Sequence, residues 1–242
     1  MTDLLSRGLR ALGRRLLPPP RLDTMARVIR NDARADTFFR AIEYVNFERV
    51  EGDIVECGVF GGLSLAVLAK GATFDPKGMK RRIVGVDTFT GLPASEETHA
   101  RWQEGDCASM HAWHPILEPG APVTADTTRA LFAACGLDAP VLYEGRFDAV
   151  LPGVVPASHP AIALLHVDCD LYESTRDVLE GVAPALQDGT VILFDDWFHY
   201  RGHPGKGEAR AFGEFLEARP EWQAVPWRSY ATFCHAFILV RR

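Results

Sequence analysis

Two strongly apolar runs of this sequence each end in a pair of aspartates. The run AIALLHV leads into Asp168 and Asp170, and the run VILF leads into Asp195 and Asp196. Short, nearly continuous apolar runs are typical of strands that are buried on both faces of a parallel sheet. Because the carboxyl ends of parallel strands meet at one edge of a sheet, the four acids are expected to lie close together there.

Strands and helices alternate along the chain, as the hydrophobic periodicity predicts. Strands are expected at 53–60, 81–87, 140–145, 161–168, 190–196, 222–227 and 232–240. Helices are expected at 34–50, 61–73, 126–135, 171–187 and 206–218. This alternation favours a Rossmann-like, doubly wound α/β fold with a mostly parallel, seven-stranded sheet. Only a short link joins the last two strands, so an antiparallel strand is expected at the C-terminus.

The length of the chain, 242 residues, fits one such domain with an N-terminal extension. Residues 1–33 are predicted to form a basic arm, and residues 34–242 the main domain, with a lid-like insertion at 88–122. The arm carries five arginines in its first 21 residues, and its leucines have helical spacing. This pattern predicts an amphipathic helix that contacts a second copy, although contact with a membrane surface is an alternative. We therefore expect a homodimer or a higher homo-oligomer.

Charge and cysteine content narrow the class of protein. A net charge of -6 and a pI near 5.8 argue against a general nucleic-acid binder. No apolar run approaches the roughly 20 residues of a transmembrane segment. The five cysteines are scattered without metal-site spacing, which favours reduced thiols and a cytoplasmic location. Cys57 and Cys169 are expected to be small buried hydrophobic residues.

A glycine-rich turn follows the first predicted strand. The sequence ECGVFGG contains Glu56, Gly58 and Gly62, and the next strand ends in Asp87. Glycines let the backbone turn tightly against a ligand, and an acid at the second strand end is the usual partner of ribose hydroxyls. The pattern lacks the glycine spacing of a pyrophosphate site, which excludes a typical dehydrogenase. It favours S-adenosylmethionine, unless Asp87 only caps the following turn.

The four carboxylates at the other two strand ends predict a site for a hard cation. Grouped carboxylates repel one another unless a cation lies between them, and an all-oxygen ligand set favours magnesium, calcium or manganese. Two simpler interpretations remain open at this stage. Asp170 is well placed to cap the helix that follows it, and the pair Asp195–Asp196 could simply begin a loop.

The stretches VECGVFGGLS, GVDTFTGLP, HVDCDLYEST and ILFDDW resemble the motifs of the macrocin O-methyltransferase family, from about Thr24 to Trp197. That family comprises magnesium- and S-adenosylmethionine-dependent enzymes that methylate sugar hydroxyls of natural products. The resemblance implies that Asp168, Asp195 and Asp196 bind the metal and that Asp170 is the general base. It implies that the cofactor contacts Thr24, Met25, Glu56, Cys57, Gly58, Val59, Phe60, Gly62, Asp87, Thr88, Phe89, Gly91 and Thr124.

The sequence departs from the family pattern where the acceptor should bind. The family often has Trp in place of Phe60 and Arg in place of Gly61, and segments 95–122 and 197–210 do not follow its pattern. These departures leave the identity of the acceptor open, while the resemblance implies a small molecule with a hydroxyl or vicinal diol, such as a glycoside. A metal would stabilise that hydroxyl as an alkoxide while Asp170 removes its proton, for in-line methyl transfer. A catechol-type acceptor, or a non-catalytic cofactor-binding subunit, remains an alternative.

Overall fold

The computed structural model describes residues 23–74, 79–97, 99 and 101–242. The basic helix predicted within residues 1–21, with its proposed role in dimer contact, lies outside the described residues. The division of the chain at residue 33 stays a prediction.

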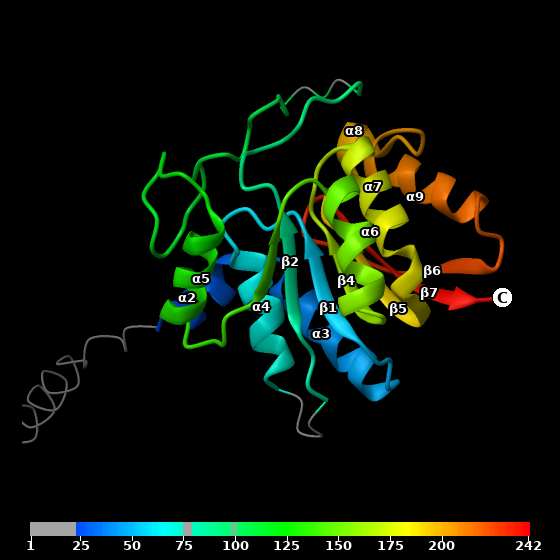
Figure 1. The fold of residues 1–242 in the computed structure, drawn as a ribbon, viewed down its shortest axis with the longest axis horizontal. Coiled ribbons are helices and arrows are strands. Elements are labelled where there is room, and N and C mark those ends of the chain that lie inside the picture. The colour runs from blue at the N-terminus through cyan, green and yellow to red at the C-terminus, as the bar shows by residue number, and fades with distance from the viewer. Residues whose placement is uncertain (1–22, 75–78, 98, 100) are drawn as a thin grey trace, which may run out of the picture.

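The predicted seven-stranded sheet is present, in the order β3-β2-β1-β4-β5-β7-β6 (Figure 1). Its strands are β1 (Asp53–Cys57), β2 (Ile83–Asp87), β3 (Val141–Glu144), β4 (Ile162–Val167), β5 (Leu186–Phe194), β6 (Trp222–Tyr230) and β7 (Cys234–Arg241). Strands β1 to β5 are parallel, whereas β7 is antiparallel to both of its neighbours. The prediction of a mostly parallel sheet with an antiparallel strand near its C-terminus is therefore confirmed.

The strand register places the predicted site residues along one edge. Cys57 pairs with Val86 on one side and with Val167 on the other, and Val167 pairs with Phe194. These residues end or nearly end their strands, so the segments that follow β1, β2, β4 and β5 leave the sheet at the same level. This is the edge at which doubly wound sheets bind their ligands.

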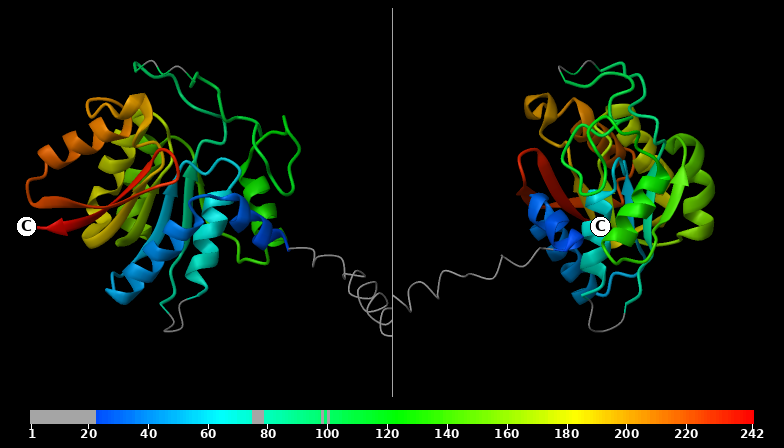
Figure 2. Two further views of the ribbon diagram at one scale, coloured as in Figure 1. Left: turned by 180° about the vertical axis from the view of Figure 1, so that it is seen from behind. Right: turned by 90° about the vertical axis from the view of Figure 1, so that its left-hand side faces the viewer.

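Helices cover both faces of the sheet (Figures 1 and 2). One layer consists of α2 (Thr24–Asn31), α3 (Ala35–Phe47), α4 (Leu63–Ala72) and α5 (Ala125–Ala134). The other consists of α6 (Phe147–Ser158), α7 (Tyr172–Val182) and α9 (Gly207–Glu217), with the short helices η1 (Ala183–Ala185) and α8 (His199–Gly202) nearby. Neighbouring residues of β4 serve opposite layers, since Leu164 packs in the first and Leu165 in the second. Burial on both faces explains why the strands are continuously apolar.

Helix α6 was not predicted from the sequence. Its segment contains Pro152 and Gly153, which are the two least favourable residues in a helix interior. Tertiary packing compensates for this, because Leu151 is fully buried and its Cβ lies where a side chain on Gly181 of α7 would stand. Helices α2 and α8 were also not predicted.

Replacing Leu151 with Ala is expected to lower the free energy of unfolding by about 3 kcal/mol, because it leaves a cavity between α6 and α7. The measurement is urea denaturation followed by circular dichroism. Ile116→Ala is a suitable control, since Ile116 is 39% exposed and should cost less than about 1 kcal/mol. Equal losses in the two variants would contradict the packing role of Leu151.

The predicted lid, residues 88–122, lacks helices and strands in its described part apart from an isolated bridge between Ser109 and Pro122. Its first half is fixed by buried Glu97, which accepts hydrogen bonds from the Gly207 amide (2.8 Å) and the Arg210 guanidinium (2.9 Å) at the start of α9. Glu173 of α7 accepts a further bond from the Ser95 hydroxyl (2.8 Å). The insertion is therefore attached to the two helices beside the carboxylate edge.

Two further expectations concern the whole described chain. All five cysteines are free, and Cys57 and Cys169 are buried as predicted. Among the described residues, no helix combines the length and the apolar character that a membrane span requires.

Candidate active site

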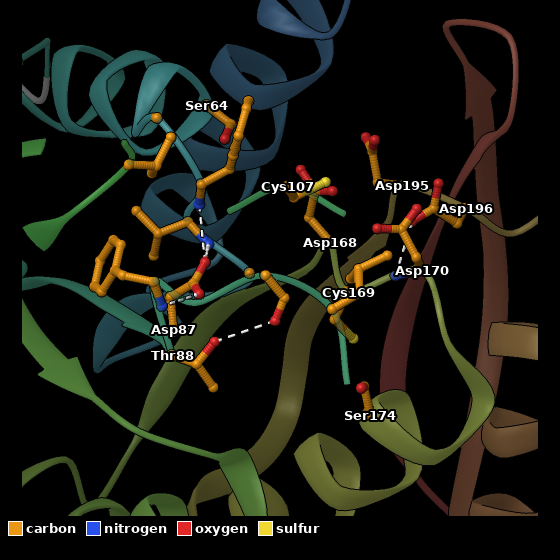
Figure 3. Close-up of a pocket in the computed structure, with 18 of the residues that line it drawn as sticks. Ser64, Asp87, Thr88, Cys107, Asp168, Cys169, Asp170, Ser174, Asp195 and Asp196 are labelled. Carbon is orange, nitrogen blue, oxygen red and sulfur yellow. Dashed lines mark hydrogen bonds between the residues drawn. The ribbon is translucent and has the colours of Figure 1, made fainter. Parts of the chain in front are cut away.

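A cavity of about 430 Å³ opens at the carboxyl edge of the sheet (Figure 3). Its size lies within the range usual for small-molecule sites. Most of the predicted site residues line it: Gly58, Val59, Phe60, Asp87, Thr88, Phe89, Gly91, Asp168, Asp170, Asp195 and Asp196. The predicted cofactor turn and the predicted metal cluster therefore share one cavity.

The turn after β1 is held by the carboxylate of Asp87. Oδ2 of Asp87 accepts hydrogen bonds from the amides of Val59 (2.7 Å) and Phe60 (2.9 Å), and Oδ1 accepts one from the Phe89 amide (2.8 Å) (Figure 3). Asp87 thus does cap its own turn, as the simpler interpretation had it, and it also fixes the glycine turn. A carboxylate has about four lone-pair sites, so one remains for a ligand hydroxyl.

Glycine is required at position 58. Gly58 has φ +92°, and a Cβ built on it would lie 1.6 Å from the carbonyl oxygen of Asp168. The segment after β1 can approach the segment after β4 this closely only because Gly58 has no side chain.

The surroundings of Gly61 explain why this chain has no large side chain where the family often has Arg. A Cβ on Gly61 would lie 2.7 Å from Cε of Met110, and the Gly61 carbonyl lies 3.1 Å from Nε2 of His114. Both contacts come from the lid, which therefore packs where a larger side chain would otherwise project. The ring of Phe60 lies 5.0 Å from that of His111, also in the lid.

The remaining predicted cofactor residues do not line the cavity: Thr24, Met25, Glu56, Cys57, Gly62 and Thr124. Met25 is a buried core residue of α2, and Thr124 caps α5 through a reciprocal bond pair with Thr127. Gly62 is the N-cap residue of α4 and has the left-handed conformation. The roles of these six residues toward a cofactor stay predictions.

The four aspartates converge, but not by the strand alternation expected from the sequence. Strand β4 ends at Val167, and Asp170 adopts a left-handed backbone conformation with φ +60°. That turn directs the Asp170 amide to Oδ2 of Asp196, at 3.1 Å (Figure 3). Asp170 does not cap α7, because the N-cap residue is Leu171 and it makes no side-chain cap bond. The simple capping interpretation of Asp170 is therefore wrong.

Burial and mutual repulsion raise the pKa values of several carboxyl groups of the cluster. Burial, together with the carboxylates of Asp168 and Asp195, raises the pKa of Asp170 to about 8. Burial and neighbouring carboxylates also raise the pKa values of Asp168 and Asp196 well above the usual range. Buried Glu208, which the sequence did not single out, adds to this charge and accepts a bond from the Asp196 amide (2.9 Å). Such a cluster favours a bound cation.

Arg34 is another residue of the site that sequence reasoning missed. Its Nη1 atom lies 2.9 Å from Oδ2 of Asp168 and 2.9 Å from Oδ1 of Asp195. Burial alone would raise the pKa of Asp195, but Arg34 and the nearby His166 imidazole hold it below its usual value. Asp195 therefore stays ionised among acids whose pKa values are raised.

A buried pair connects the two halves of the site. Glu56 and His166 are both fully buried, and Oε1 of Glu56 lies 2.7 Å from Nδ1 of His166. The other ring nitrogen, Nε2, lies 3.8 Å from Oδ1 of Asp195, too far for a hydrogen bond. Burial would lower the pKa of His166, but the carboxylates of Asp195 and Glu56 raise it to about 10. Glu56, predicted as a cofactor residue, thus supports the imidazolium behind Asp195.

The donor set fits a hard cation. Asp168, Asp195 and Asp196 each offer a carboxylate oxygen, and these oxygens lie within 4.8 Å of one another. Asp170, Asp196 and His199 form a second group of the same compactness. In the second group burial and His99 lower the pKa of His199 to about 4, so its imidazole is neutral near pH 7. The all-oxygen group matches the preference of magnesium better than the group that contains an imidazole.

Comparison with known proteins finds a family and several relatives that resemble this chain. The family model of macrocin-O-methyltransferase (TylF) matches residues 9–217. A 4'-O-methyltransferase of 8-demethyl-8-(2,3-dimethoxy-alpha-L-rhamnosyl)-tetracenomycin-C from Streptomyces olivaceus is 35% identical over 172 residues, covering 68% of this chain and 60% of the relative. The demethyldecarbamoylnovobiocin O-methyltransferase of Streptomyces niveus is 30% identical, with the same coverages. The chain thus spans about 60% of the length of these curated relatives.

Solved structures show the same fold. The calicheamicin methyltransferase CalS11 is 29% identical, with a TM-score of 0.59 over 84% of this chain and 76% of that one. The O-methyltransferase NovP has a TM-score of 0.63 over 86% of this chain and 80% of that one; at 23% identity it supports the fold alone. With a family model that spans most of its length, this chain belongs to the macrocin-O-methyltransferase family.

Proposed function

We propose that this protein transfers a methyl group from S-adenosylmethionine to a sugar hydroxyl of a glycosylated natural product, with the help of a divalent cation. The observation that carries the proposal is the shared cavity, which places the Asp87-held glycine turn opposite the carboxylate cluster. A non-catalytic subunit would need the glycine turn, but it would not need Asp170 to line the cavity beside the predicted cation ligands, where a general base could reach an acceptor hydroxyl.

One group of residues would bind the methyl donor, and another residue would act on the acceptor. Asp87 and the glycine turn would hold the nucleoside part of the donor, since a carboxylate accepts from ribose hydroxyls and the turn leaves room for the backbone to approach. Asp170 would accept the proton of the attacking hydroxyl. The donor already carries a good leaving group, so holding the two reactants in line supplies much of the remaining acceleration.

A divalent cation, when bound by Asp168, Asp195 and Asp196, would lower the pKa of the acceptor hydroxyl. Glu208 would orient the metal ligand Asp196 by accepting a hydrogen bond from the Asp196 amide. The positive charge of His166 would orient the metal ligand Asp195 by attraction. Such supporting contacts behind ligands are common in metal sites.

A sugar acceptor is favoured over a catechol. A relative at 35% identity is named for an α-L-rhamnosyl compound, and a solved structure at 27% identity with a TM-score of 0.53 is described as a TDP-rhamnose 3'-O-methyltransferase. The names of these relatives carry the preference, because the cavity lining itself includes aromatic residues such as Phe60, Phe89 and Trp102. We therefore propose rhamnosides as the first acceptors to test.

Isothermal titration tests the donor half of the proposal without an acceptor. The wild type is expected to bind S-adenosylhomocysteine, and Asp87→Asn to bind it at least about tenfold more weakly, because a charge-assisted hydrogen bond is lost. Asp138→Asn, a change at an exposed position, should match the wild type. Absence of nucleoside binding by the wild type would overturn the proposed function, whatever the cluster binds.

A further inference from the structure

Arg34 lies at the corner between α2 and α3, and its guanidinium reaches into the carboxylate cluster. One nitrogen, Nη1, contacts both Asp168 and Asp195, at 2.9 Å each. The side chain is only 19% exposed. Asp168 and Asp195 are two of the three carboxylates whose oxygens are close enough to share a cation. A permanent positive charge therefore already bridges two members of the candidate metal site.

The position of Arg34 is fixed from behind. Asp32 accepts hydrogen bonds from Nε of Arg34 (3.0 Å) and from Nη2 (3.2 Å), and it also accepts one from the Arg34 backbone amide (2.8 Å). The guanidinium also lies 5.5 Å above the ring of Phe38. The bonds to Asp32 occupy Nε and Nη2 of the guanidinium, so Nη1 is directed at the carboxylate cluster.

The stability of α3 does not explain why an arginine occupies position 34. Arg34 is the N-cap of α3, where its side chain makes no cap bond. A cation at a helix N-terminus opposes the helix dipole, so this position is unfavourable for an arginine unless another partner compensates. The partners are Asp168 and Asp195, which leave the sheet 134 and 161 residues later in the chain.

We propose that Arg34 is a built-in counter-cation of the carboxylate cluster, and that it lowers the affinity of the cluster for a divalent cation. The proposal rests on the proposed function in so far as the cluster is taken as the cation site. With Arg34 in place, Asp168 and Asp195 are already partly neutralised, so a divalent ion gains less from them and is repelled by the guanidinium. Without Arg34, the carboxylates would repel one another until an ion binds.

Arg34 also forms part of a wall between two cavities. Arg34 and Asp195 line the cavity described above and a second one, of about 320 Å³, beside α2 and the turn between β6 and β7. The ion pair between Arg34 and Asp195 therefore borders both cavities, and an ion that approaches Asp195 also meets the guanidinium.

The test is titration of the metal-free protein with magnesium chloride after EDTA treatment, followed by calorimetry. Arg34→Gln keeps a polar side chain that can donate to a carboxylate but removes the charge. We expect it to bind Mg²⁺ at least about tenfold more tightly than the wild type, since a nearby like charge is removed. We also expect its melting temperature in EDTA to fall and to recover when Mg²⁺ is added.

Arg40→Gln is the matched control, because Arg40 lies on the same helix and forms an exposed ion pair with Asp36. It should bind Mg²⁺ as the wild type does. Arg34→Lys retains the charge and should bind Mg²⁺ within about threefold of the wild type; a gain equal to that of the Gln variant would show that packing, not charge, sets the affinity.

Unchanged or weaker Mg²⁺ binding by Arg34→Gln would overturn the proposal, as would the absence of binding in both proteins. If the Gln variant unfolds in EDTA, refolding by Mg²⁺ supports the proposal, and failure of Mg²⁺ to refold it contradicts the proposal. S-adenosylhomocysteine binding, measured in parallel, reports on the proposed function separately, because it does not depend on the cluster.

Discussion

Replacing Asp170 with Asn is expected to slow methyl transfer by about 10²–10⁴-fold, the usual contribution of a general base. The amide has nearly the same shape as the carboxyl group but cannot accept the proton. Asp170 is suited to the role because it lines the cavity beside the predicted cation ligands, and in the metal-free protein burial and the carboxylates of Asp168 and Asp195 raise its pKa to about 8. Its backbone amide is fixed to Asp196, which holds the side chain beside the predicted cation ligands.

The measurement is the rate of S-adenosylhomocysteine formation with a rhamnoside acceptor, together with the affinity for S-adenosylhomocysteine in its absence. The Asn variant should lose turnover and keep the affinity, since the Asp87 contacts are untouched. Asp126→Asn on the surface of α5 serves as control, because the Asp126 side chain is 90% exposed. Normal turnover in the Asn variant would shift attention to His199, whose Nδ1 lies 3.2 Å from Oδ1 of Asp196 and whose imidazole is neutral near pH 7.

Features that depend on strand ends were predictable from the sequence. Continuous apolar runs identify buried parallel strands, and such strands bring their carboxyl ends to one edge whatever the details of the loops. This is why the sequence alone predicts that Asp87, Asp168 and Asp195 lie together, and all three line one cavity. The same reasoning gave the sheet and its antiparallel C-terminal strand.

Features that depend on contacts between distant segments were not predictable. Arg34 has no motif around it, and its partners are more than a hundred residues away. The His166–Glu56 pair is buried between β4 and β1, and alternation along one strand does not reveal which polar residue lies opposite. Helix α6 was missed because packing of Leu151 outweighs the low helix propensity of Pro152 and Gly153.

The conformation of Asp170 was also beyond sequence reasoning. Alternation along a strand was expected to direct Asp168 and Asp170 to the same side, but β4 stops before either residue. The left-handed turn at Asp170 brings them together instead. Non-glycine residues in that conformation are uncommon and cost free energy, which surrounding contacts have to offset. Here the bond from the Asp170 amide to Asp196 is such a contact.

Replacing Gly58 with Ala is expected to lower the free energy of unfolding by about 4 kcal/mol or more, an exceptional loss for one methyl group. The residue has φ +92°, and the added Cβ would lie 1.6 Å from the carbonyl oxygen of Asp168. Because both atoms belong to backbone segments, no side-chain rotation can relieve the clash. Strands β1 and β4 would have to separate where the Asp168 amide bonds to the Cys57 carbonyl at 2.9 Å.

Urea denaturation measures the loss of stability, and titration with S-adenosylhomocysteine and Mg²⁺ measures its effect on the site. Gly213→Ala is the matched control, because Gly213 lies on the exposed side of α9 and an added Cβ would meet nothing within 4 Å. That change should stabilise the protein by up to about 1 kcal/mol through helix propensity. A Gly58 variant that folds normally but binds neither ligand would show that the turn serves the site alone. Loss of stability together with both ligands would show that one backbone contact holds the cofactor turn and the carboxylate cluster in register.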